Sequence, residues 1–98
     1  MYFLKALPNN YLARLLIRFQ VKYTDSDGDY PVTRKVWISE NGSWTSANMI
    51  AGSGSYASGQ RYYVDFDFGT DESRYDNRTY KFDFNDGTNA ATGVNGNV

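Results

Sequence analysis

Apolar and polar side chains alternate strictly between residues 15 and 23, and this pattern constrains the fold more than any other feature of the chain. A period of two residues is typical of a half-buried strand in an antiparallel sheet, because successive side chains point to opposite faces. One face comprises Leu15, Ile17, Phe19, Val21 and Tyr23. The opposite face comprises Leu16, Arg18, Gln20 and Lys22. We therefore predict a strand over residues 15–23 with its first face in a hydrophobic core.

Other apolar or alternating segments predict further strands, separated by turn-forming residues. These strands are expected at residues 1–7, 33–39, 44–49, 62–68, 78–85 and 90–98. Pro8-Asn9-Asn10 is expected to close the first strand, and Asn41-Gly42 to form a tight hairpin turn. Residues 51–59 carry mostly small side chains. We therefore predict that they form a loop crossing between two sheets.

Six or seven short strands without a convincing helix predict an all-β fold. We expect an immunoglobulin-like antiparallel β-sandwich of about seven strands, with a small barrel as the alternative. A length of 98 residues corresponds to a single domain over residues 1–98. Residues 90–98 are expected to form a weak or flexible last strand. Residues 1–10 can be a separate strand donated to a neighbouring subunit, but pairing within their own sandwich is expected because sequential strands usually stay together.

The composition argues against several classes of function. The net charge is −1 and no basic cluster stands out along the sequence, so nucleic acid is not an expected partner. The chain lacks the run of about 20 apolar residues that a membrane helix needs. Histidine and cysteine are absent, which removes the usual general base and the thiol nucleophile, and we do not expect an enzyme. Asp65, Asp67 and Asp83 resemble a glycosidase carboxylate set, but we expect them to face solvent opposite Lys and Arg.

The turn between the second and third predicted strands carries three carboxylates at alternate positions, Asp25, Asp27 and Asp29, with Gly28 between them. Calcium takes six to eight oxygen ligands, and alternate carboxylates can point to a common centre. In such a sandwich this turn and the turn near Asp86 lie at the same end. The sequence therefore predicts a Ca²⁺ site formed by these four aspartates. The alternative is that Asp and Gly are present because they form good turns.

Exposed aromatic residues offer a second candidate site. Trp37 and Trp44, with Tyr63 and Tyr75, can stack on sugar rings while nearby polar groups bind hydroxyls. The alternative is that both tryptophans belong to the core, since a buried Trp on the third strand is common in this fold. We expect the core position for both and keep carbohydrate binding as the second function.

Two triplets match the acceptor motif for N-linked glycans. They begin at Asn41 and Asn77. Each residue can carry a glycan if the chain is exported.

Several motifs occur in an order that resembles a known family. Residues 23–31 read YTDSDGDYP, residues 54–59 read GSYASG, and residues 80–87 read YKFDFNDG. The set resembles the immunoglobulin-like repeats, of the fibronectin-III or PKD-like kind, of archaeal and bacterial cell-surface and S-layer-type proteins. The resemblance covers residues 15–92. It implies a noncatalytic, extracellular structural or adhesive module that associates with itself or with neighbouring domains and can assemble into a filament or lattice.

Overall fold

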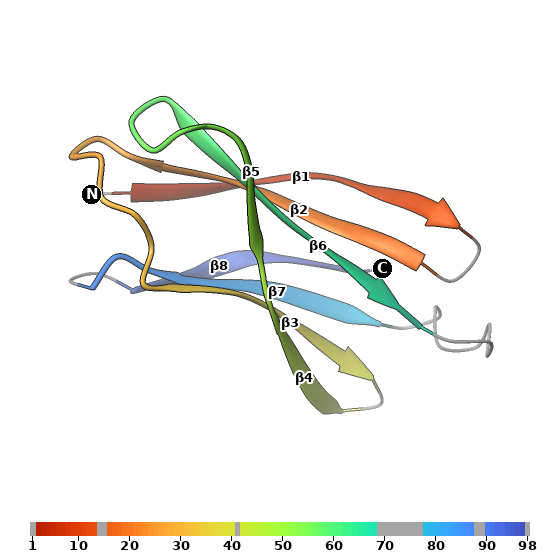
Figure 1. Cartoon of the computed structure of the whole chain (residues 1–98). Helices are drawn as coiled ribbons and strands as arrows, with labels where there is room; N and C mark the ends of the chain where they lie inside the picture. Colours follow the sequence, from red (N-terminus) through yellow and green to blue (C-terminus); the bar gives the residue numbers. More distant parts are fainter. Residues whose placement is uncertain (1, 14–15, 41, 69–77, 88–89, 98) are drawn as a thin grey trace.

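The computed structural model describes residues 2–13, 16–40, 42–68, 78–87 and 90–97, and these form eight strands and no helix (Figure 1). The strands are β1 (Tyr2–Ala13), β2 (Leu16–Asp25), β3 (Thr33–Glu40), β4 (Ser43–Asn48), β5 (Ile50–Ser55), β6 (Gly59–Asp67), β7 (Thr79–Asn85) and β8 (Ala90–Asn97). The part of the chain that the structure describes contains no helix that could span a membrane. The predicted all-β fold is confirmed.

The strands form two sheets of four, in the orders β1-β2-β6-β5 and β4-β3-β7-β8. Every neighbouring pair is antiparallel. The pairs β1–β2, β3–β4, β5–β6 and β7–β8 are each formed by consecutive strands. The chain changes sheet after β2, after β4 and after β6. The two sheets face each other as the layers of a sandwich (Figure 1).

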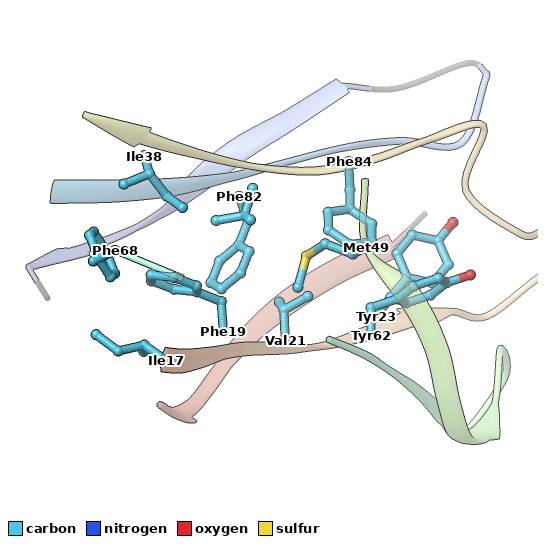
Figure 2. Packing of buried hydrophobic residues seen from close by; sticks show 11 residues of the cluster. Ile17, Phe19, Val21, Tyr23, Ile38, Met49, Tyr62, Phe68, Phe82 and Phe84 are labelled. Carbon is cyan, nitrogen blue, oxygen red and sulfur yellow. The ribbon is translucent and has the colours of Figure 1, made fainter. Parts of the chain in front are cut away.

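The core lies between the sheets and is built mainly from aromatic rings (Figure 2). Tyr23 stacks on Phe84 at 5.8 Å between ring centroids, and Tyr62 meets Phe84 edge-on at 5.4 Å. Such pairs stabilise a core beyond the area they bury. The buried apolar residues are Ile17, Phe19, Val21, Tyr23, Val36, Ile38, Met49, Tyr62, Phe68, Phe82 and Phe84.

Strand β2 confirms the alternation on which the prediction rested. Ile17, Phe19, Val21 and Tyr23 are fully buried. The strand runs two residues further than predicted, so Asp25 belongs to its end. This extension matters for the site, because it turns Asp25 toward the interior.

The prediction that the first strand ends at the Pro8 turn is wrong. Strand β1 continues through Pro8 to Ala13 and pairs with β2 of the same chain, with register shifts between Leu7 and Asn10 and between Tyr11 and Ala13. Proline is tolerated there because β1 is an edge strand, where the missing N–H breaks no ladder bond.

The predicted loop over residues 51–59 is also wrong in part. Most of it forms β5, which pairs with β6 at the sheet edge and is exposed along its whole length. Backbone hydrogen bonds define a strand even where its side chains bury nothing. The crossing between sheets that the loop was expected to make occurs just before it, at Met49, between β4 and β5.

Candidate functional site

The acidic turn begins at the buried end of β2. Asp25 is fully buried, and its Oδ1 accepts a hydrogen bond of 2.8 Å from the backbone N–H of Asp27. Its Oδ2 lies 3.3 Å from the hydroxyl of Tyr23, which also lies 3.1 Å from the carbonyl oxygen of Asp29. The Asp25 backbone N–H donates to the carbonyl of Tyr56 at 2.7 Å. The Asp27 backbone N–H and the Tyr23 hydroxyl therefore hold both carboxylate oxygens of Asp25 in place.

Three carboxylates come together at this turn. One oxygen from each of Asp25, Asp27 and Asp29 lies within 4.8 Å of the others, and Asp27 and Asp29 are exposed. Gly28 has a φ of 79°, in the left-handed region that glycine enters without strain. Its backbone N–H donates to the Asp25 carbonyl at 2.9 Å. The cluster can hold a metal ion, with one buried and two solvent-accessible carboxylates.

The turn before β3 and the turn after β7 lie at the same end of the sandwich, as predicted (Figure 1). The N–H of Val32 donates to the carbonyl of Asn85 at 2.7 Å. Asp86 shares with Asp29, Tyr30 and Val32 an open surface hollow of about 280 Å³. Among the described carboxylates, however, the group within 4.8 Å contains Asp25, Asp27 and Asp29 and does not include Asp86.

The expectation that both tryptophans belong to the core is wrong. Trp37 lies between Val36 and Ile38, which are both fully buried, so its side chain points to the outer face of the β4-β3-β7-β8 sheet. Trp44 on the edge strand β4 is 46% exposed. It pairs across the ladder with Ser39, which also faces outward. Both rings therefore stand on one outer sheet face.

Charged groups surround the two tryptophans. The Nε1–H of Trp37 donates to Oδ2 of Asp83 at 3.2 Å. The ammonium of Lys35 lies 5.9 Å from the Trp37 ring centroid, and that of Lys81 lies 4.5 Å from the Trp44 ring centroid. Cation–π contacts of this kind hold a lysine against a ring face. The outer face thus combines two aromatic rings with two cations and one carboxylate.

The other predicted carboxylates and aromatics take structural positions. Asp65 faces outward and binds Arg18 through two contacts of 2.6 and 3.1 Å, and hydrogen bonding to this guanidinium lowers the Asp65 pKa below its ordinary value. Tyr63 is half-buried beside the guanidinium groups of Arg18 and Arg61. Three further sequence candidates, Asn41, Tyr75 and Asn77, lie outside the described residues.

The structure also contains a surface hollow that no feature of the sequence predicted. It has a volume of about 390 Å³, lies where the chain crosses from β4 to β5, and is lined in part by Arg34, Tyr56 and Tyr62. The hydroxyls of Tyr56 and Tyr62 lie 3.2 Å apart, and burial raises the pKa of Tyr62 above its ordinary value. Arg34 donates from Nε to the Met49 carbonyl at 3.2 Å. The hollow thus brings Arg34 of β3 beside Tyr56 and Tyr62.

Comparison with protein-family models, with curated proteins and with solved structures found no match for this chain. The acidic turn and the outer sheet faces are therefore the features of the molecule that bear on its function.

Proposed function

We propose that the chain is a noncatalytic, extracellular structural or adhesive module with an immunoglobulin-like fold, a member of a self-assembling surface filament or lattice. The strand order supports the immunoglobulin-like fold, and the resemblance of the sequence motifs to surface repeats supports the extracellular, assembling role. Immunoglobulin-type sandwiches place strands A, B, E and D in one sheet and C, F and G in the other, with C′ added beside C. The orders β1-β2-β6-β5 and β4-β3-β7-β8 correspond to that arrangement strand by strand.

Electron microscopy of the native material tests assembly, and light scattering of the purified chain over a range of concentrations complements it. We expect filaments or a lattice in the native sample and concentration-dependent association of the purified chain. A dispersed monomer under every condition, including millimolar Ca²⁺, would refute the assembly role.

In this proposal, Ca²⁺ bound at the acidic turn stiffens the domain and takes no part in chemistry. The support is the set of three carboxylates within 4.8 Å, which supplies the hard oxygen ligands that Ca²⁺ takes. Comparing the unfolding midpoint in millimolar Ca²⁺ with that in chelator tests the idea. An unchanged midpoint would remove the metal from the proposal.

Carbohydrate binding is the second candidate, and the outward position of both tryptophans favours it. Aromatic rings on a sandwich face can stack on sugar rings, and the Asp83 carboxylate beside Trp37 can accept hydrogen bonds from sugar hydroxyls. We expect soluble polysaccharide to quench the tryptophan fluorescence. Trp44→Ala should weaken binding more than the control Tyr30→Ala, which removes an exposed ring beside the acidic turn. A glycan array with no response would leave only the structural role.

A further inference from the structure

The surface hollow at the crossing from β4 to β5 has the size and lining of a small-molecule site. Its volume is about 390 Å³, and such sites typically enclose about 300–1,000 Å³ with apolar walls and a few convergent polar groups. Met49, which belongs to the buried core (Figure 2), and the exposed Ile50 supply apolar wall. Arg34, Tyr56 and Tyr62 supply the polar groups. The hollow therefore opens beside the core and not on a flat sheet face.

Arg34 places a cation at this opening from the inner face of β3. Its side chain has the same phase along the strand as those of Val36 and Ile38, which are fully buried. The Nε–H of Arg34 donates to the Met49 carbonyl at 3.2 Å. Within the described part of the chain, its two Nη groups have no hydrogen-bond partner and no carboxylate forms an ion pair with it. Arg34 is exposed, so a ligand can reach these groups.

The two tyrosine hydroxyls leave one donor unused beside this cation. They lie 3.2 Å apart, so one O–H donates to the other oxygen and the second O–H needs a different acceptor. None of the described residues provides that acceptor. The rings are held in place, because Tyr62 is only 2% exposed and the Tyr56 carbonyl accepts the Asp25 N–H at 2.7 Å. Burial raises the pKa of Tyr62 and the Arg34 charge opposes this rise, which indicates that the guanidinium lies close to the hydroxyl.

We propose that this hollow binds a small organic carboxylate that carries an apolar group. The Nη groups of Arg34 can bind both carboxylate oxygens, and the unused tyrosine O–H can donate to one of them. The apolar group would lie against Met49 and Ile50. A single cation suits a singly charged anion better than a phosphate monoester, whose charge is about −1.5 to −2. The site goes beyond the proposed function, since it uses neither the carboxylates of the acidic turn nor the tryptophan face.

Titration of phenylacetate into the full chain, followed by heteronuclear NMR, tests the proposal. We expect saturable shifts at millimolar ligand that centre on the amides of Met49, Ile50 and Tyr56. Phenylacetamide lacks the negative charge and should bind about tenfold more weakly, because its contact with the guanidinium is no longer between charged groups. Acetate lacks the apolar group and should also bind more weakly.

Variants locate the site. Arg34→Gln should weaken phenylacetate binding about tenfold through the loss of charged hydrogen bonds. Either tyrosine can supply the unused donor, so the double variant Tyr56→Phe/Tyr62→Phe should weaken binding about threefold. Lys35→Gln is the matched control, because it removes the same charge from the next residue of β3, whose ammonium lies 5.9 Å from the Trp37 ring centroid on the outer face. It should bind like wild type.

Thermal unfolding in the absence of ligand separates loss of the site from loss of the fold, and Arg34→Gln should unfold cooperatively because the side chain is exposed. Absence of saturable phenylacetate binding would overturn the proposal, as would equal losses in Arg34→Gln and Lys35→Gln or equal binding of phenylacetamide. Tighter binding of phenyl phosphate than of phenylacetate would overturn the carboxylate assignment.

Discussion

The substitution Asp29→Asn should change the stability of the domain in opposite directions with and without Ca²⁺. Oxygens of Asp25, Asp27 and Asp29 lie within 4.8 Å of one another. At that distance two unit charges repel by about 0.9 kcal/mol in water, and Asp29 interacts with two such neighbours. Without metal, Asp29→Asn should therefore raise the free energy of unfolding by about 0.5–1 kcal/mol at low ionic strength, because Asp27 and Asp29 are exposed and solvent screens their repulsion. The gain should be smaller in added salt.

With Ca²⁺ the order should reverse. An ion that binds only the folded state stabilises it by about 2.7 kcal/mol at a concentration one hundred times its dissociation constant. Asp29→Asn removes one negatively charged ligand and should lose most of that gain. Wild type should thus be the less stable protein in chelator and the more stable one in Ca²⁺.

Urea titrations followed by circular dichroism measure this crossing, in chelator and in millimolar Ca²⁺ at low salt. Asp67→Asn is the control, because it removes an exposed carboxylate at the opposite end of the β2-β6 ladder and should respond to Ca²⁺ like wild type. Asp25→Ala should lower stability in both buffers by about 1.5–3 kcal/mol, since it removes a buried charged acceptor. The reasoning is refuted if the Asp29→Asn variant is less stable than wild type in chelator. It is also refuted if Ca²⁺ raises the free energy of unfolding of the variant as much as that of wild type.

Three further predictions concern the core and the turns. Phe84→Ala removes a fully buried ring and should cost about 3–5 kcal/mol in urea unfolding, so a loss below about 1 kcal/mol would contradict the packing. Burial raises the pKa of Tyr62 in the folded state, so its stabilisation is complete below the unfolded value of about 10 and is lost as pH rises above it. Tyr62→Phe should therefore lose less stability than wild type between about pH 10 and 12, and identical alkaline profiles by circular dichroism would contradict this. Gly54→Ala and Gly42→Ala both place a side chain at positive φ, but only the first would collide with the Gly59 carbonyl, so Gly42→Ala should cost about 1 kcal/mol and Gly54→Ala clearly more in thermal unfolding.

The sequence determines the inner faces of the sheets well. The alternation around Phe19 and Val21 predicts which side chains are buried, because a slip of one residue would move all of them to solvent. The same pattern already puts Trp37 on the opposite face from Val36 and Ile38. The prediction that Trp37 lies in the core relied on the usual position of tryptophan in such folds and not on this alternation. The structure agrees with the alternation.

Edges and ends were harder to predict, because backbone pairing defines them and side chains give little signal. Strand β5 buries none of its residues, so nothing in its composition distinguishes it from a loop. Pro8 is a turn signal in most contexts, and only the edge position of β1 makes it compatible with a strand. No feature of the sequence indicates that β2 extends to Asp25, although this extension is the reason that the carboxylate is buried.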